Sequence, residues 1–451
     1  MVPTSQRLTS TAGLGTLLEA FDESPLRAPF ENCLPSREIR GKCQGAYRLG
    51  LIQVASFLQG HDCLADLDQF REDPNLAEVM RGETVAPRTM GDFLRDFEPS
   101  HLHRMNEFLA TQAKSYRVQL EKMLKKPFKP SLAPRLNIDS TSHVQRGVKM
   151  EGLAYNYKSE WCLDSQVIFD ELGFCWDMEL RSGNTKSGVG AGDQVRRAFS
   201  SYKFADEKYL SGDSAYCNQE MITTCLGLGA KFTLTAHQGT TGWENHISEI
   251  TSWSPWKWSA EQVAEAKERD MTLPEIDVGH FYWRPSWNEV LCLPVVVKRT
   301  RRSEQLSLIE GEWKYYGVVT NFNLASSSPQ DVIAFHNKRG NAENFIREEK
   351  YGYDLKHFPC LEMKANHAYG LLAMVAHNIL RWVSIHENPS RPRFAKGIRA
   401  RFVHVPGKVV SHARTLVLRV SQHVFEEVNR IRQALELKPY SSPIPVGFAT
   451  G

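Results

Sequence analysis

The feature that most constrains the fold is an ordered series of strand and helix patterns that begins near residue 135. Short runs rich in β-branched and aromatic residues alternate with stretches that carry apolar residues at helical spacing. Three strands come first, and then a helix, a strand, a helix and a strand follow. The ranges are 135–139, 163–169 and 174–180 for the first three strands, and 195–199, 209–213, 218–226 and 230–236 for the later elements. This order predicts a mixed α/β sheet with helices on its faces.

The order of these elements is that of an RNase H-like domain, and the rest of the chain has a different texture. The first 128 residues have helical spacing, and 75–97 resembles a helix-turn-helix, although two packed helices of a bundle give the same pattern. Seven of the ten tryptophans lie between residues 240 and 321, among expected strands at 290–298 and 313–320. We therefore predict an α/β RNase H-like catalytic domain with a mostly β insertion, plus an α-helical N-terminal DNA-binding domain.

The expected domain boundaries follow from these changes of texture. They are 1–128 for the helical DNA-binding and dimerisation domain, 129–239 and 329–390 for the two parts of the catalytic domain, 240–328 for the insertion, and 391–451 for a basic C-terminal region. In the C-terminal region we expect a strand pair over 400–405 and 416–420 and a final helix over 426–437.

A long helix is expected after residue 328, because Ser328 is a good N-cap and Pro329 suits the first helical turn. Residues three or four positions apart share one helical face. One face would therefore carry a glutamate with cations on both sides, namely His336, Arg339, Glu343, Arg347 and Lys350. This stripe suits phosphodiester chemistry, in which a carboxylate holds a divalent cation and basic side chains neutralise phosphates. A solvated helix with intrahelical ion pairs has the same pattern.

Two aspartates favour the catalytic interpretation of this helix. Asp139 and Asp213 each follow an apolar strand, and carboxylates at the ends of adjacent strands converge at one edge of a sheet. A helix packed on that sheet can bring Glu343 within reach. Three carboxylates so close together do not all stay ionised without a cation. Two Mg²⁺ ions about 3.5–4 Å apart would relieve the repulsion and clamp both oxygens of an in-line displacement.

The spacing Arg339-x3-Glu343-x6-Lys350 resembles the Tyr-x2-Arg-x3-Glu-x6-Lys signature of a large superfamily of bacterial insertion-sequence DDE transposases, with His336 at the tyrosine position. The strings at 66–73, 139–141, 180–185 and 336–343, together with Asn366, are similar to the insertion-sequence family numbered 1380. The resemblance covers about residues 45–420. The superfamily carries a β insertion where the tryptophans of this chain lie.

The resemblance implies a function and a role for each signature residue. The implied function is to bind terminal inverted repeats, cleave DNA at the ends of the element and join the 3′-hydroxyl to target DNA by two-metal phosphoryl transfer. Asp139, Asp213 and Glu343 would be the catalytic residues and would hold two Mg²⁺ ions, for which Mn²⁺ can substitute. The implied DNA contacts come from His336, Lys338, Arg339, Arg347 and Lys350. The implied partners are double-stranded DNA and a second copy of the chain, because both ends are cut in concert.

The net charge of +3 conceals three basic stretches that would attract polyanions. Residues 391–425 carry eight Lys or Arg and no acid, and we expect Arg399 and Arg401 to contact flanking or target DNA. The other stretches are 114–135 and 298–302, and a solvated face explains any single stretch as well. The sequence lacks an apolar run of membrane-spanning length, a signal core near its start and a Cys-x2-Cys pair. These features favour a cytoplasmic, nucleoid-associated protein.

Two other functions stay open at this level. One is a transposase-derived DNA-binding protein that no longer cleaves DNA, since a fold does not settle activity. The other is an RNase H-like structure-specific endonuclease, which shares the metal site but needs no strand transfer. The presence of all three carboxylates with Arg339 and Lys350 favours the transposase over the first alternative. A joined DNA product separates it from the second.

Overall fold

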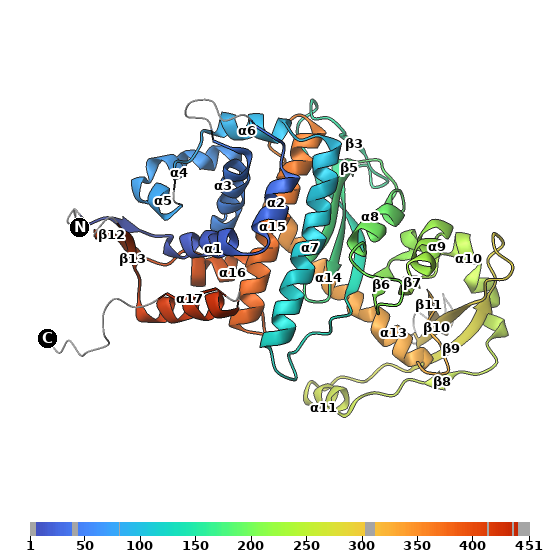
Figure 1. Cartoon of the computed structure of the whole chain (residues 1–451). Coiled ribbons are helices and arrows are strands. Elements are labelled where there is room, and N and C mark those ends of the chain that lie inside the picture. The colour runs from blue at the N-terminus through green and yellow to red at the C-terminus, as the bar shows by residue number, and fades with distance from the viewer. Residues whose placement is uncertain are drawn as a thin grey trace.

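A large mixed sheet organises the computed structural model, which describes residues 6–37, 44–80, 82–302, 312–412, 415–434 and 437–440 (Figure 1). The ten-stranded sheet has the order β3-β4-β2-β6-β7-β11-β10-β9-β8, and β5 also pairs with β4. The strands are β2 (Arg135–Val144), β3 (Ala154–Tyr155), β4 (Trp161–Asp170), β5 (Cys175–Ser182), β6 (Tyr209–Gly212), β7 (Lys231–Thr235), β8 (Ser254–Pro255), β9 (Ile276–Trp283), β10 (Leu293–Arg301) and β11 (Trp313–Thr320).

The first part of the sheet follows the expected order of elements. β4 is antiparallel to β2 and β5, whereas β6 is parallel to both β2 and β7. The connections that lead into β6 and β7 contain α8 (Ala191–Ala198) and α9 (Gln219–Gly227), as parallel pairing requires a crossover. The expected end of the first strand is wrong. β2 continues to Val144 because its second half pairs with β4, so Asp139 lies inside a strand.

Residues 240–328, the predicted β insertion, add four strands to this sheet. β11 pairs antiparallel with β7, and β10 and β9 follow it in antiparallel register. The expected strand at 313–320 is β11, whereas the strand expected at 290–298 starts three residues later as β10. The helical parts of the insertion are α10 (Gln238–Thr241), a 3₁₀ segment (Trp243–Glu249) and α11 (Ala260–Glu268).

The N-terminal helices share one hydrophobic core with the sheet. α7 (Pro99–Met123) and α15 (Met363–Glu387) pack on each other and on β5, and α15 also contacts α3 (Ala46–Gln59) and α6 (Pro87–Arg95) (Figure 1). The core is continuous from Leu14 to Ile431, so the helical segment 1–128 is not an independent unit in this structure. The remaining N-terminal elements are α1 (Ala12–Glu23), α2 (Arg27–Cys33), a 3₁₀ turn (Leu64–Asp66), α4 (Leu67–Glu72) and α5 (Pro74–Val79).

The helix-turn-helix pattern corresponds to α5 and α6. α6 buries Met90, Phe93 and Leu94 and contacts α15 and α3, which is the packing of a bundle helix. α15 itself is buried on nearly every side along its 25 residues. Among the described helices, none has the length and apolar character needed to cross a membrane.

The two ends of the chain meet in a small second sheet of order β1-β12-β13. β1 (Leu8–Thr9) pairs with β12 (Gly407–His412), which pairs with β13 (Thr415–Arg419), and α17 (Gln422–Ala434) follows (Figure 1). The strand expected at 400–405 is wrong. That stretch is α16 (Ala395–Ile398) followed by a π-helical turn (Arg399–Val403), because Phe402 and Val403 pack inward against α1.

Candidate active site

Two aspartates lie side by side where the central parallel strands β2 and β6 separate. The last register pair is Ile138 with Gly212, so Asp139 and Asp213 are the next residues of the two adjacent strands. Asp213 caps the 3₁₀ turn Ser214–Tyr216, because its Oδ1 accepts a hydrogen bond of 2.9 Å from the Ala215 amide. Asp139 Oδ1 accepts one of 2.8 Å from the Ser140 amide. The two aspartates therefore lie on neighbouring strands, Asp139 within β2 and Asp213 directly after β6.

Glu343 is held near this edge by α14 (Asn341–Gly352). Its neighbours Phe345 and Ile346 are buried, and the Phe345 ring packs on Phe169 of β4 with centroids 5.8 Å apart. Glu343 itself is exposed. The helix thus anchors itself on the sheet with its apolar side while the carboxylate stays open to solvent and to a substrate.

The pKa of Asp139 shows that these carboxylates act on one another. Burial and, to a lesser extent, the charges of Asp213 and Glu343 raise this pKa to about 6, against the opposing effects of Arg339 and of the hydrogen bond from the Ser140 amide. Like charges that disfavour ionisation of a buried carboxylate are relieved by a bound cation. The three carboxylates stand further apart than the ligand atoms of a closed metal site. Among the described residues, the acidic group whose ligand atoms lie within 4.8 Å of one another is a different one, Asp62, Cys63 and Asp66.

Two signature cations flank the carboxylates. Arg339 Nη1 lies 3.4 Å from Asp139 Oδ2, and both side chains are about four-fifths buried. Lys350 Nζ donates a hydrogen bond of 2.7 Å to the Ser142 carbonyl oxygen, three residues beyond Asp139 on β2. Burial lowers the pKa of Lys350. Both cations therefore approach β2 from the segment that carries Glu343.

The expected single helix is interrupted before Glu343. α13 (Pro329–Asn337) passes into a 3₁₀ turn (Lys338–Gly340) and only then into α14. A 3₁₀ turn has 3.0 residues per turn where an α-helix has 3.6. The stripe deduced from α-helical spacing is therefore broken, and His336 does not share a face with Glu343. Ser328 does cap α13 as expected, since its Oγ accepts a hydrogen bond from the Asp331 amide.

His336 is buried instead of facing DNA, which corrects the expected phosphate contact. Only 1% of it is exposed. Its Nδ1 lies 3.0 Å from Thr233 Oγ1, and its Nε2 lies 3.1 Å from Thr235 Oγ1 and 3.0 Å from the Tyr316 hydroxyl. Burial, with a further effect of Arg339, lowers the pKa of His336 to about 4. The neutral imidazole thus links α13 to β7 and β11 through hydrogen bonds.

Replacing His336 with glutamine is expected to lower the unfolding free energy by about 1–3 kcal/mol at neutral pH, because buried hydroxyls lose their partner. The folded-state pKa is depressed from 6.5 to about 4, so the stabilisation is complete above pH 6.5 and is lost as the pH falls towards 4. Urea unfolding of both proteins between about pH 7.5 and 4.5 measures this. The difference in unfolding free energy between the wild type and H336Q should become smaller as the pH falls. A difference that is constant with pH contradicts the assignment of a neutral buried imidazole.

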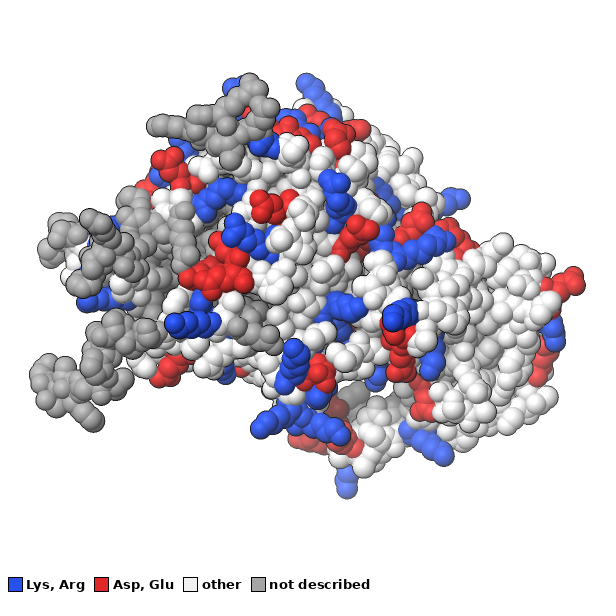
Figure 2. All heavy atoms as spheres, in the orientation of Figure 1, with Lys and Arg blue, Asp and Glu red and all other residues white. Residues whose placement is uncertain are grey.

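Of the other side chains predicted to contact DNA, three are exposed and one is buried. Lys338 and Arg347 are exposed on either side of Glu343. Arg401 is exposed too, but its Nε lies 2.6 Å from Glu387 Oε1. Arg399 is buried and donates to the carbonyl oxygens of Phe57, Leu58 and Gly352, which corrects its expected DNA contact. On the face seen in Figure 2, basic and acidic side chains are intermixed.

Arg181 is a residue near the site to which sequence reasoning gave no role. Its guanidinium pairs with Asp164 of β4 and donates a hydrogen bond of 3.0 Å to the Val189 carbonyl oxygen. The same loop places Ser187 Oγ 2.8 Å from Ser140 Oγ, next to Asp139. Arg181 therefore holds the glycine-rich loop 183–190 against the acidic edge. The sequence feature that could have indicated this role is the presence of Asp164 and Arg181 in an otherwise apolar hairpin.

Carboxylates grouped with cations are the chemistry that enzymes use to handle phosphodiesters with divalent metal ions. The family described as "Transposase DDE domain group 1" matches residues 3–439. The chain belongs to this family and is a DDE transposase, a class of enzyme that cleaves and transfers DNA. No curated protein matches the chain.

Proposed function

We propose that this chain binds the terminal inverted repeats of an insertion sequence, cleaves DNA at the two ends and joins each 3′-hydroxyl to target DNA. The observation that carries the proposal is the grouping of Asp139 and Asp213, on two neighbouring parallel strands, with Glu343 of α14. The charges of Asp213 and Glu343 both raise the pKa of Asp139. The order and directions of β2, β4, β5, β6 and β7 support an RNase H-like arrangement for this domain. The narrower resemblance to the insertion-sequence family numbered 1380 is part of the same proposal.

Asp139, Asp213 and Glu343 would hold two Mg²⁺ ions, with Mn²⁺ as a substitute. The donor set fits such ions, because hard divalent cations prefer carboxylate oxygens, and the raised pKa of Asp139 is consistent with an excess of negative charge that a cation would offset. When bound, the ions polarise the attacking water or hydroxyl and stabilise the leaving oxygen. The exposed side chain of Glu343 is free to turn towards the two aspartates for this role.

The chain's own cations position the DNA. Arg339 neutralises Asp139 in this structure, and a cation at the carboxylates would release the guanidinium to contact the scissile phosphate. Lys350, whose side chain reaches from α14 to β2, would contact a neighbouring phosphate. Lys338, Arg347 and Arg401 would follow the backbone further away. These contacts position reactants and offset charge, which is most of what phosphoryl transfer requires.

Two further properties belong to this proposal. Both ends of an element must be cut in concert, so we infer a homodimer on paired transposon ends. The substrate is chromosomal DNA, so the protein would act in the bacterial cytoplasm in association with the nucleoid.

The double substitution Lys338→Ala with Arg347→Ala is expected to weaken binding of all DNA sequences alike. Each lost phosphate contact lowers the slope of log K against log salt by about 0.9, so two lost contacts lower it by about 2. Anisotropy titrations at several salt concentrations measure the slope. Arg71→Ala is the matched control, since Arg71 forms an exposed surface pair with Asp68 on α4. An unchanged slope in the double variant removes these two residues from the DNA interface.

A direct test of the function uses purified protein, Mg²⁺ and linear DNA that carries the element's own ends. Cleavage at the ends, absent with scrambled ends, supports the transposase. Binding to the ends without cleavage in Mg²⁺ or Mn²⁺ supports the DNA-binding alternative. Cleavage governed by DNA shape, irrespective of the end sequence, supports the endonuclease.

A further inference from the structure

A basic and aromatic surface lies on the connection between β2 and β4. Figure 1 shows the place of β3, which lies within this connection. β2 leads from Asp139 to Val144, and at about 3.3 Å per residue this spans about 17 Å. The chain then loops out through β3 and returns at Trp161. We use the name β2–β4 surface for the side chains of this connection and the adjoining end of α14, namely Arg146, Val148, Lys149, Tyr155, Tyr157, Lys158, Tyr351 and Lys356.

The aromatic rings of this surface are unusually open to solvent. Tyr157 is 91% exposed, Tyr351 71% and Tyr155 65%. Lys158 Nζ lies 5.4 Å from the centroid of the Tyr157 ring, and Lys356 Nζ lies 5.4 Å from that of Tyr351. Since isolated aromatic residues usually bury most of their area, several exposed rings with cations beside them mark an interaction site.

The surface is held in place although its rings are exposed. The Tyr155 ring packs on Trp161 with centroids 4.9 Å apart, and Trp161 Nε1 donates a hydrogen bond of 2.9 Å to the Gly147 carbonyl oxygen. Glu160 accepts hydrogen bonds from Asn156 Nδ2 at 2.7 Å and from Ser142 Oγ at 3.0 Å. The Tyr155 ring and the backbone turn that carries Tyr157 are therefore held in place before binding, which reduces the entropy lost on binding.

Two contacts join this part of the chain to α14, which carries Glu343, and to the segment that follows α14. Lys350 Nζ donates to the Ser142 carbonyl oxygen at 2.7 Å, and Gln145 Nε2 donates to the Lys356 carbonyl oxygen at 2.7 Å. The signature lysine thus lies between the carboxylates and the exposed rings. A strand of DNA that leaves the carboxylates along β2 would pass Lys350 and then reach the β2–β4 surface.

The charge of the surface indicates which kind of partner it fits. Arg146, Lys149 and Lys158 are exposed cations, and they outnumber the two acids of the connection, Glu151 and Glu160. Lys356 forms an ion pair with Asp354, with Nζ 3.3 Å from Oδ1. Exposed rings beside cations match a polyanion with flat apolar faces. Single-stranded DNA has this chemistry, because its unpaired bases stack on aromatic rings while its phosphates meet the cations.

We propose that the β2–β4 surface binds the single strand of DNA that continues beyond the cleaved phosphate, with its bases stacked on Tyr155 and Tyr157. The inference rests on the proposed function, because that function places the cleaved phosphate at the three carboxylates. It adds a binding site outside the signature helix and assigns the tyrosines a role in holding an unpaired strand.

The test compares pre-cut end duplexes that are either blunt or carry a single-stranded extension of about 12 nucleotides, within the usual site size of a single-strand binding surface. The wild type is expected to bind the extended duplex about tenfold or more tightly than the blunt one, the range that stacking of one or two bases gives. Tyr155→Ala with Tyr157→Ala should remove this preference, and Tyr155→Phe with Tyr157→Phe should keep it, because stacking needs the ring and not the hydroxyl. Tyr282→Ala, an exposed tyrosine of β9, is the matched control.

Equal binding of both duplexes by the wild type, or a preference that survives the double alanine variant, would overturn the inference. End cleavage by the wild type is followed on uncut DNA in parallel. Cleavage without an extension preference refutes the β2–β4 surface alone, whereas an extension preference without cleavage refutes the proposed function. Both tyrosines are largely exposed, so their replacement leaves the core intact.

Discussion

Asp139→Asn, Asp213→Asn and Glu343→Gln are each expected to lower the rate of end cleavage by about 10³-fold or more. Each change removes one negative charge and one metal-binding oxygen while it keeps the shape of the side chain. Metal ions supply several kcal/mol of transition-state stabilisation, and about 1.4 kcal/mol corresponds to tenfold in rate. DNA binding should persist in all three variants, since charge neutralisation at the carboxylates does not remove a phosphate contact.

Cleavage rates and DNA affinities of the purified variants measure this expectation. Asp193→Asn is the matched control, because Asp193 is an exposed acid of α8 that pairs with Arg196 on the same helix. It should cleave like the wild type. A variant of the three that cleaves within tenfold of the wild type removes its residue from the site.

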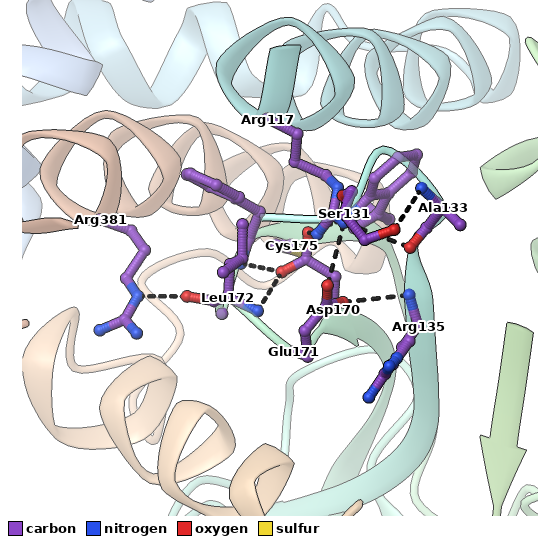
Figure 3. A network of polar contacts seen from close by, with 12 residues as sticks. Arg117, Ser131, Ala133, Arg135, Asp170, Glu171, Leu172, Cys175 and Arg381 are labelled. Atoms are coloured by element: carbon purple, nitrogen blue, oxygen red, sulfur yellow. Dashed lines mark hydrogen bonds and ion pairs between the residues drawn. The ribbon is translucent and has the colours of Figure 1, made fainter. Parts of the chain in front are cut away.

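Arg117→Ala is expected to lower the unfolding free energy by about 3–5 kcal/mol, the cost of leaving a buried charge without its partner. Arg117 is 1% exposed, and its guanidinium lies 2.9 Å from Asp170 Oδ2 and 2.9 Å from Glu171 Oε1 (Figure 3). Asp170 also accepts hydrogen bonds from Trp176 Nε1 and from the amides of Leu172 and Phe174. Removal of the arginine would leave the buried Asp170 carboxylate without its cationic partner.

The same network fixes the strand that carries Asp139. Glu171 Oε2 accepts a hydrogen bond of 3.0 Å from the Arg135 amide, at the first residue of β2. Arg117 thus connects α7 to the turn after β4 and, through Glu171, to β2 (Figure 3). Denaturant unfolding measures the loss, with Arg71→Ala as a surface-pair control that should cost less than about 1 kcal/mol. An Arg117→Ala loss as small as that of the control contradicts the structural role of the network.

The pairing of Asp139 with Asp213 was predictable because it depends on local patterns. Each aspartate follows a short apolar run, and the order of three strands, a helix and a strand is that of an RNase H-like domain, in which the first and fourth of these strands are parallel neighbours, as β2 and β6 are here. The length of β2 was not predictable in the same way. Residues 140–143 are Ser, Thr, Ser and His, which lack an alternating apolar pattern, and only their pairing with the distant strand β4 makes them a strand.

The roles of His336 and Arg399 could not be predicted from spacing or charge. His336 lies at the expected distance from Glu343 in sequence, but its partners Thr233, Thr235 and Tyr316 come from β7 and β11. Arg399 belongs to a basic run, but carbonyl oxygens of Phe57, Leu58 and Gly352 surround its guanidinium. In both cases the burial of a polar side chain depends on segments far away in the sequence, which tertiary packing brings together.

The insertion illustrates the same limit at the level of domains. Its strands were expected from alternation, and β11 begins and ends as predicted. Its attachment was not, because β11 joins the central sheet through pairing of Val318, Val319 and Thr320 with β7. The tryptophan content and the expected strands predicted an insertion there, without the strand to which it pairs. The free edge of β7, left open once β6 occupies its other side, gave the insertion a strand to pair with.

Strand joining tests the central claim most directly, because it separates a transposase from any enzyme that only cuts or binds DNA. Purified protein is mixed with Mg²⁺, a supercoiled target plasmid and labelled pre-cut end duplexes that finish in either a 3′-hydroxyl or a 3′-hydrogen. We expect label to appear in the plasmid only with the 3′-hydroxyl, and not with Asp139→Asn. Absence of joined product with the 3′-hydroxyl, under conditions where the protein binds and cuts the ends, would contradict the account.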